Sequence, residues 1–277
     1  MKLGHYQTLE VVNKTDFGLY LQKTKDQTGD KVLLPKKEVP AGTEIGDLIE
    51  VFIYKDSEDR NIATTAKLPL TLGGLARLKV IDVTNIGAFL DWGLLKDLFL
   101  PFKEQTFKVK VGDEVLVTLY IDKSNRLCAS MKVYDYLATD SNYKKDDIVT
   151  GYVYEYIDNF GLFVAIDNKY SAMIPKNELF QPIKTGETIT ARVTQIRDDG
   201  KLSLSPRKKA HIQMDEDADM ILEKLKDAGG FLPYHDYSDA KEIRDFFHIS
   251  KNAFKRAIGR LYKAGTITIS QDGIRLL

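Results

Sequence analysis

The sequence predicts a mainly β chain in which three small barrels in tandem precede a C-terminal α+β domain. Three observations predict this: a set of landmarks that occurs three times, runs of alternating apolar and polar residues within each repeat, and helical spacing near the C-terminus. Alternation with a period of two is typical of half-buried strands, whereas apolar residues three and four apart indicate amphipathic helices. The chain of 277 residues is therefore expected to hold four domains, at 1–66, 67–137, 138–210 and 211–277.

Each repeat carries the same four landmarks in the same order. A glycine follows an aromatic or aliphatic residue and opens a short apolar strand, an apolar residue then precedes a proline, a turn glycine comes eleven residues after that proline, and a basic residue leads the last strand. The landmarks are Gly18, Pro35, Gly46 and Arg60, then Gly87, Pro101, Gly112 and Arg126, and finally Gly161, Pro175, Gly186 and Lys201. Such a period indicates one supersecondary unit used three times.

About five short strands fit into each repeat, and Gly, Asp and Asn punctuate them as turn residues do. A five-stranded unit of this size closes most economically into a small Greek-key barrel, the OB-fold, because closure removes the exposed edges of the sheet. The outer face of such a barrel binds oligonucleotides. The repeats therefore predict three OB-folds.

The repeated motifs resemble the S1 RNA-binding family of OB-folds, whose pattern is Phe-Gly-x-Phe and, later, an Asp four residues before an Arg. Residues 160–163 read Phe-Gly-Leu-Phe, and the other repeats carry the variants Phe17 with Tyr20 and Ile86 with Phe89. The second motif is present as Asp56 with Arg60 and as Asp122 with Arg126, whereas repeat 3 has Arg197 and Lys201 at those positions. All three repeats carry proline where the family usually has an RNA-facing histidine. The resemblance implies RNA binding, with a more basic surface in repeat 3.

Physical reasoning supports the same residues. A bulge centred on the glycine would turn both aromatic rings of a repeat to the outer face, where bases stack on them and nearby cations neutralise phosphates. The alternative is that these rings fill the barrel core, and three parallel occurrences favour binding. Repeat 3 is expected to bind most strongly, repeat 2 to lose one ring at Ile86, and residues 138–277 to carry most of the affinity. The candidate residues are Phe17, Tyr20, Arg60, Phe89, Arg126, Phe160, Phe163, Arg197 and Lys201.

The C-terminal region predicts three helices and a β-hairpin. The apolar stripes that indicate the helices are Ala218, Ile221, Leu222 and Leu225, then Ala240, Ile243, Phe246 and Phe247, and then Phe254, Ala257, Ile258 and Leu261. Ser250 is the expected N-cap of the third helix, which Gly265 ends after Ala264. Asp272-Gly273 favours a tight turn between the last two strands. Three helices followed by a hairpin make a winged helix.

The third helix is strongly basic, since it has no acidic residue between positions 248 and 264. In helix-turn-helix proteins this helix enters the major groove. Together with a basic linker it would extend an RNA track from repeat 3, whereas a solvated face or a protein-docking helix is the alternative. The candidate cations are Arg207, Lys208 and Lys209 in the linker and Lys251, Lys255, Arg256, Arg260 and Lys263 in the helix.

Three S1-like units with a terminal winged helix resemble the bacterial conserved virulence factor B family over the whole chain. The resemblance implies an RNA-binding regulator of gene expression that acts after transcription. We expect single-stranded RNA as the partner and the ribosome or RNA-processing proteins as further candidates. The alternatives are a winged-helix regulator that binds duplex DNA and an adaptor that docks on the ribosome or on proteins. No dimerisation helix is evident, so we expect a monomer.

Composition excludes other classes of protein. The 40 basic residues equal the 40 acidic residues, so any nucleic-acid surface must be local. A single cysteine, Cys128, and the absence of an apolar signal core or a run of about 18 apolar residues predict a cytoplasmic protein away from membranes. The acidic groups at 146–147, 198–199 and 215–217 are explained as solvated loops, and the four histidines lack metal spacing. We therefore expect no catalytic residue, no metal site and no cofactor.

Overall fold

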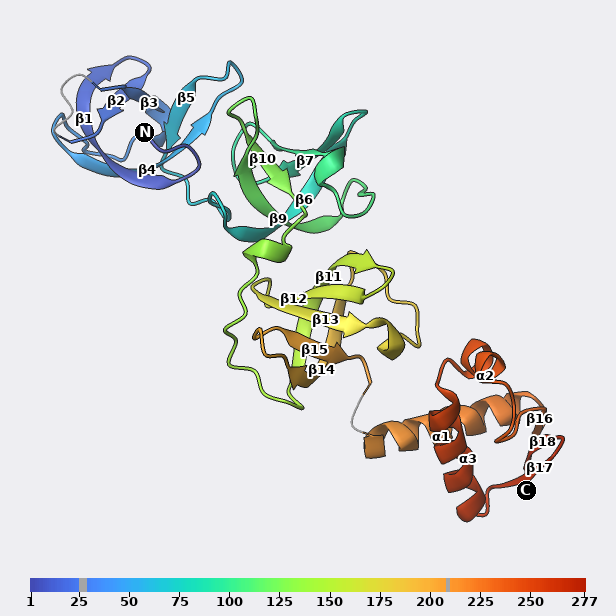
Figure 1. The fold of residues 1–277 in the computed structure, drawn as a ribbon. Helices are drawn as coiled ribbons and strands as arrows, with labels where there is room; N and C mark the ends of the chain where they lie inside the picture. Colours follow the sequence, from blue (N-terminus) through green and yellow to red (C-terminus); the bar gives the residue numbers. More distant parts are fainter. Residues whose placement is uncertain (25–28, 208–209) are drawn as a thin grey trace. The chain divides into compact units, whose positions relative to one another are not determined.

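The computed structural model describes residues 1–24, 29–207 and 210–277, and it follows the expected mainly β plan (Figure 1). Barrel 1 contains β1 (Tyr6–Thr15), β2 (Gly18–Gln22), β3 (Val32–Pro35), β4 (Leu48–Lys55) and β5 (Asn61–Thr64). Barrel 2 contains β6 (Leu75–Val83), β7 (Gly87–Asp91), β8 (Leu98–Pro101), β9 (Glu114–Ile121) and β10 (Leu127–Ser130). Barrel 3 contains β11 (Ile148–Ile157), β12 (Gly161–Ile166), β13 (Tyr170–Pro175), β14 (Thr188–Ile196) and β15 (Leu202–Ser205).

The strands of each barrel are connected in the OB-fold manner. Barrels 1 and 3 close in the order β1-β2-β3-β5-β4 and β11-β12-β13-β15-β14, and the third and fifth strands pair in parallel. Barrel 2 is a five-stranded sheet in the order β10-β9-β6-β7-β8. The predicted fold class is confirmed, because the same strand order arises three times from the same landmarks.

A short 3-10 helix follows the landmark proline of every barrel and anchors the last strand. These helices are η1 (Lys36–Glu38), η2 (Phe102–Glu104) and η4 (Lys176–Glu178). The glutamate that ends each helix accepts a hydrogen bond from a buried hydroxyl at the end of the fifth strand. The pairs are Thr64 with Glu38, Ser130 with Glu104 at 2.7 Å, and Ser205 with Glu178 at 2.8 Å. A buried hydroxyl is costly unless it is hydrogen-bonded, so this repeated pair fixes where each helix lies.

Barrel 1 has a hydrophobic core of its own and also contributes residues to the core of barrel 2, which we call the shared core. Phe52 of β4 is fully buried in a cluster that also contains Trp92 and the interior residues of barrel 2, and the two rings lie 6.1 Å apart. The Tyr6 hydroxyl is hydrogen-bonded to the segment that connects the two barrels. It donates to the carbonyl of Ala66 at 2.9 Å and accepts from the N–H of Leu68 at 2.6 Å. Because apolar surface of both barrels is buried in one cluster, we infer that they fold as a unit.

The C-terminal winged helix packs three helices against a small sheet. Its elements are α1 (Ala210–Asp227), β16 (Phe231–Leu232), α2 (Ala240–Phe247), α3 (Lys251–Lys263), β17 (Ile267–Ser270) and β18 (Gly273–Leu276). The inward residues predicted for the third helix are all buried, and Ser250 caps it by accepting from the N–H of Ala253 at 3.2 Å. The two strands of the predicted hairpin pair antiparallel, and β16 adds a third strand beside β18.

The stripe predicted for the second helix is wrong at two positions. Ile243 and Phe247 are buried, whereas Ala240 is exposed and Phe246 is 37% exposed. The reason is the length of α2, because eight residues make only about two turns and present one narrow apolar stripe. Phe246 lies at the edge of that stripe, 4.9 Å from the Tyr234 ring. In the first helix Leu222 is only partly buried against the core.

The contacts between residues divide the chain into two compact units. One unit holds residues 1–138 with 165–171, and the other holds 139–164 with 172–277. The first unit contains barrels 1 and 2, in agreement with their shared core. The division into four domains stays a prediction.

Replacing Leu21 by Ala is expected to unfold barrels 1 and 2 together at a lower denaturant concentration. Leu21 is fully buried in the barrel 1 core, and its loss should cost about 2–5 kcal/mol. The only tryptophan, Trp92, reports the unfolding of the shared core by fluorescence. The equally buried Leu204 of barrel 3 provides the control, since Leu204→Ala should leave the Trp92 midpoint unchanged. A Trp92 midpoint that Leu21→Ala does not move would show that barrel 1 unfolds alone.

Candidate nucleic-acid interface

The glycine that opens the second strand of each barrel allows that strand to lie directly against the third. Gly18, Gly87 and Gly161 have φ values of 148°, 157° and 123°, which side-chain-bearing residues rarely adopt. A Cβ at these positions would lie 2.0, 2.4 and 2.2 Å from the carbonyl oxygens of Leu34, Leu100 and Ile174. These positions therefore require glycine for both conformation and space.

The predicted position of the bulge is wrong. The irregularity lies in the first strand, between Val11 and Asn13 in β1 and between Val80 and Asp82 in β6. The glycine is instead the first residue of the second strand, so the ring before it stands in the turn. That turn leaves Phe17 79% exposed.

In barrel 3 the two predicted aromatic residues lie together. The rings of Phe160 and Phe163 are 6.5 Å apart at an interplanar angle of 62°, and Phe163 is 6.2 Å from the ring of Tyr154. Phe160 is 57% exposed and Phe163 is half-buried. The Lys176 N–H donates to the carbonyl of Phe160 at 3.0 Å, as the Lys36 N–H does to Phe17 at 2.9 Å. A lysine therefore stands opposite the leading aromatic residue in barrels 1 and 3.

Barrel 2 lacks a ring before its glycine, as predicted, but an exposed aromatic residue stands at the start of its 3-10 helix. Gly87 pairs with Pro101, which places Ile86 opposite Phe102, and Phe102 is 47% exposed. Phe89 pairs with Phe99, and their rings lie 5.3 Å apart. Sequence reasoning missed Phe99 and Phe102, although their positions two before and one after the landmark proline mark them. The ranking of barrel 3 above barrel 2 does not follow from this geometry.

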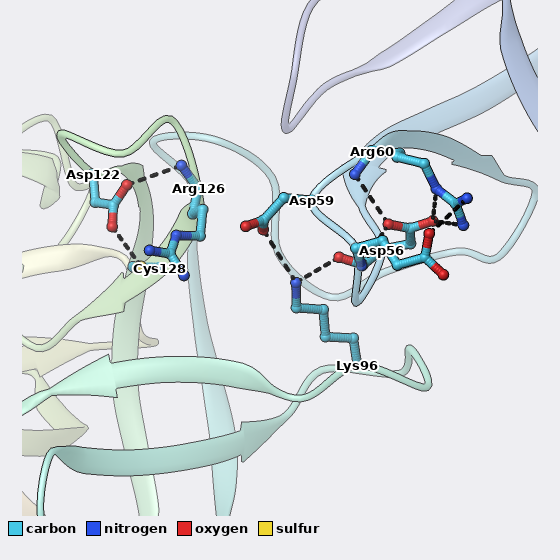
Figure 2. A network of polar contacts seen from close by, with 8 residues as sticks. Asp56, Asp59, Arg60, Lys96, Asp122, Arg126 and Cys128 are labelled. Carbon is cyan, nitrogen blue, oxygen red and sulfur yellow. Dashed lines mark hydrogen bonds and ion pairs between the residues drawn. The ribbon is translucent and has the colours of Figure 1, made fainter.

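The Arg60 cation of barrel 1 is already paired (Figure 2). Its guanidinium donates to Asp56 at 2.8 and 3.0 Å and pairs with Glu58 at 2.7 Å. Burial alone would raise the pKa of Asp56, but the hydrogen bonds from Arg60 outweigh it and hold that pKa below its usual value. Tyr20 of β2 is half-buried and pairs with Leu33 of β3.

The corresponding loop of barrel 2 leaves its arginine side chain exposed (Figure 2). Asp122 accepts from the backbone N–H of Arg126 at 2.9 Å, while its other oxygen faces the Cys128 thiol at 3.9 Å. Burial, followed by the nearby Asp122 charge, raises the pKa of Cys128 to about 11, so the thiol stays protonated and inert at neutral pH. Lys96 donates to the Asp56 carbonyl at 2.6 Å, which ties barrel 2 to the loop of barrel 1.

In barrel 3 the two predicted cations share one carboxylate, and the expectation of a more basic surface stays a prediction. Asp199 lies between the two predicted cations and pairs with Lys201 at 3.1 Å and with Arg197 at 3.6 Å. The hydrogen bond from Lys201 lowers the pKa of Asp199, so its negative charge is kept. The loop 197–201 holds two basic and two acidic residues and is therefore neutral. The Arg197 guanidinium also donates to the Met173 sulfur at 3.4 Å. Met173 lies in β13, the strand beside the β12 strand that carries Phe163.

Of the predicted linker cations, Arg207 lies in the described part of the chain and is ion-paired. Arg207 pairs with the buried carboxylate of Asp217 at 2.9 Å, and its guanidinium lies 5.0 Å from the Phe180 ring. It is therefore a structural cation as well as a binding candidate. Lys208 and Lys209 lie outside the described residues.

The cations of α3 stand on its solvent side. Lys255, Arg256, Arg260 and Lys263 are exposed and Lys251 is half-buried. Lys251 donates to the carbonyl of Tyr237 at 3.3 Å, and the Lys255 ammonium lies 5.8 Å from the Tyr237 ring. Tyr237 is 80% exposed and was missed from the sequence, because it stands in the loop before α2.

The acidic groups that were weighed as catalytic candidates have other partners. Asp146 pairs with Arg192 at 2.9 Å, and Asp147 accepts from the N–H of Lys144 at 2.8 Å. Within residues 1–24, 29–207 and 210–277, no group of three or more His, Cys, Asp or Glu side chains could hold a metal ion. Over the same ranges, no helix is long and apolar enough to cross a membrane.

Comparison with known proteins finds the same architecture along the chain. Residues 3–66 and 72–132 match an S1 domain, residues 142–207 match the S1 RNA binding domain, and residues 219–276 match the CvfB-like winged helix domain. The uncharacterized protein YitL of Bacillus subtilis (strain 168) is 33% identical, over 96% of this chain and 91% of that protein. Conserved virulence factor B of Staphylococcus aureus (strain N315) is 30% identical, over 99% of this chain and 94% of that protein.

One solved structure matches along almost the whole chain. It is a multidomain protein with nucleic acid binding domains from Streptococcus pneumoniae TIGR4, which is 27% identical with a TM-score of 0.52. The match covers 99% of this chain and 98% of the other. The order of three barrels and a winged helix is therefore shared with a protein of known structure.

Replacing Gly18 by Ala is expected to destabilise the first unit more than replacing Gly46. Both glycines have positive φ, so each substitution should cost about 1–3 kcal/mol of backbone strain. Only Gly18 also meets a carbonyl oxygen, whereas the space beside Gly46 is open, and overpacking should add about 1–3 kcal/mol for Gly18→Ala. Denaturant unfolding of the full chain measures both costs, and equal costs would show that the strand contact is unimportant.

Proposed function

Because the chain belongs to the conserved virulence factor B family, we propose that it is a regulator that binds single-stranded RNA on its S1 barrels and winged helix. The observation that carries the proposal is repeated in each barrel: an exposed aromatic residue lies near the glycine at which the second strand contacts the third. These residues are Phe17, Phe102 and Phe160. An aromatic ring that remains exposed on a folded barrel offers a surface on which a base stacks.

Single strands suit this surface better than a duplex does. Stacking on a side chain needs a base that has left its own stack, and such bases occur in loops and ends of RNA. The loop cations Arg60, Arg197 and Lys201 are paired with carboxylates, so attraction to phosphates contributes less than stacking. The single strand is therefore expected to be held mainly through its bases.

All three barrels take part in the proposed binding. Barrel 2 offers Phe89, Phe99 and Phe102 and also carries the exposed Arg126, and barrel 3 offers Phe160 and Phe163. The affinity is therefore expected to be shared by both halves of the chain, rather than concentrated in residues 138–277. The exposed cations of α3 supply the phosphate contacts that the paired loop cations do not.

We further propose that the protein acts as a cytoplasmic monomer and not as an enzyme. The lone cysteine and the carboxylates already engaged in ion pairs and turns support these assignments. The ribosome or RNA-processing proteins are the proposed macromolecular partners besides RNA. A duplex-DNA regulator and a docking adaptor are the competing functions.

Competition binding separates these functions. A labelled single-stranded RNA bound to the full chain should be displaced by unlabelled single-stranded RNA at a lower concentration than by duplex DNA of matching sequence. The reason is that only the unstacked bases can reach the exposed rings. Tighter binding of the duplex would favour a DNA regulator, and no binding of either would favour an adaptor.

Aromatic and cationic substitutions should weaken binding in different ways. Phe160→Ala and Phe102→Ala should each cost on the order of 1–3 kcal/mol per stacked base, with little change in salt dependence. Replacing Lys255, Arg256 and Arg260 together should flatten the logarithmic salt slope by up to roughly 2, at about 0.7 per phosphate on a single strand. Fluorescence anisotropy at several salt concentrations measures both effects. Identical changes in salt slope for the two classes of variant would contradict the division of roles.

Circular dichroism and thermal melting must first show that every variant is folded. Phe160 and Phe102 are suited to the test because they are exposed. Tyr154→Ala is the control for damage to the barrel 3 core. Tyr154 is buried next to Phe163, and its replacement should destabilise the protein by about 3–5 kcal/mol. Folded aromatic variants with wild-type affinity would remove the barrel faces from the proposal.

A further inference from the structure

We propose that the winged helix carries a separate single-strand site, in which a base stacks on Tyr237 and the adjoining phosphates contact Lys251 and Lys255. This inference rests on the proposed binding of single-stranded RNA and assigns it a second kind of surface. It differs from insertion of α3 into a duplex groove, because the site lies along one edge of the helix.

The exposure of Tyr237 is the first observation. Its side chain is 80% exposed, which is the largest value among the aromatic residues of the described chain that are exposed. Such an exposed ring contributes little to the stability of the fold, because it buries little apolar surface. The ring is therefore available to a ligand.

The loop around Tyr237 is held in place although the ring is exposed. The Tyr237 N–H donates to Nδ1 of His235 at 3.2 Å, and the His235 N–H donates to the Ser238 hydroxyl at 2.9 Å. The Lys251 ammonium donates to the Tyr237 carbonyl at 3.3 Å, which joins the loop to the first turn of α3. A ring on a fixed loop loses less freedom on binding than a ring on a mobile one.

The charges beside the ring suit a polyanion. The Lys255 ammonium lies 5.8 Å from the ring of Tyr237, and α3 contains no acidic residue. The loop itself carries two carboxylates, Asp236 and Asp239. Asp239 is engaged at the start of α2, where it accepts from the N–H groups of Lys241 and Glu242. Those backbone hydrogen bonds lower the pKa of Asp239 and keep its charge at the helix end.

The geometry of α3 extends the site along one edge. At about 100° per residue, positions 251, 255 and 262 fall within roughly 40° of one another. Tyr262 therefore lies on the same edge as the two lysines, and it is 57% exposed. The eleven residues from Lys251 to Tyr262 rise by about 16 Å, which is room for a few nucleotides between the two rings. Arg256 and Lys263 lie on another edge and provide a matched control.

The test uses the full chain and a 15-nucleotide oligouridylate or oligoadenylate as the probe. Tyr237→Ala should weaken binding at least about fivefold without changing the salt slope, as expected for loss of one stacked base. Tyr237→Phe keeps the ring and should bind within about twofold of wild type. Lys251→Ala with Lys255→Ala should flatten the salt slope by about 1.4, because each lost phosphate contact on a single strand accounts for about 0.7.

A direct readout comes from Tyr237→Trp, since the other tryptophan, Trp92, is buried in the shared core of barrels 1 and 2. The oligonucleotide should quench the new fluorescence if a base stacks there. The Arg256→Ala and Lys263→Ala double variant removes the same charge from the other edge. Its affinity should fall with the lost phosphate contacts, but the quenching reached at saturating oligonucleotide should be unchanged.

The outcomes distinguish this inference from the proposed function. Wild-type affinity of Tyr237→Ala for the oligonucleotide, together with weakened binding by Phe160→Ala, would overturn the winged-helix site and leave the barrel proposal intact. Quenching by a matched duplex but not by the single strand would assign α3 to groove binding instead. Failure of the unsubstituted chain to bind any single strand would overturn both proposals.

Discussion

The close backbone contact at Gly18, Gly87 and Gly161 is the constraint on which the rest of each barrel depends. It lets the second strand lie against the third, which places the landmark proline and the 3-10 helix after it. The glutamate of that helix then reaches the buried hydroxyl at the end of the fifth strand. The same contact forces the preceding residue into an exposed turn. One steric requirement thus sets how the second and third strands of each barrel pair. In barrels 1 and 3 it also sets the position of the ring that we assign to RNA.

The three barrels vary the chemistry around this fixed frame. Barrels 1 and 3 place an aromatic residue before the glycine and a lysine opposite it, whereas barrel 2 exchanges them for Ile86 and Phe102. The backbone hydrogen bonds do not depend on the side chains, so such exchanges leave the fold unchanged. The shared core around Phe52 and Trp92 adds a second constraint, because it holds barrels 1 and 2 as one unit.

The sequence was sufficient to predict features that depend on residues close together in the chain. The repeated landmarks predicted the barrels, and the spacing of apolar residues with a serine N-cap predicted α3 and its inward face. Features that depend on pairing across strands were missed. Phe102 becomes a neighbour of Ile86 only through the register of β7 and β8. Asp199 pairs with both Arg197 and Lys201 only because the chain turns between them. Tyr237 was missed for a similar reason, since no periodicity marks a loop residue that meets a helix from another part of the domain.

The paired cations of the barrel loops also bear on how quickly the proposed RNA ligand would associate with the protein. A chain with equal numbers of basic and acidic residues, and with Arg60, Arg197 and Lys201 paired with carboxylates, exerts little long-range attraction on a polyanion. Association without electrostatic steering proceeds at about 10⁵–10⁶ M⁻¹s⁻¹, well below the diffusion limit. Under the proposed function, discrimination between transcripts would then depend on how long each one remains bound. A transcript with several unstacked bases would be retained, while one that offers only its phosphates would leave early.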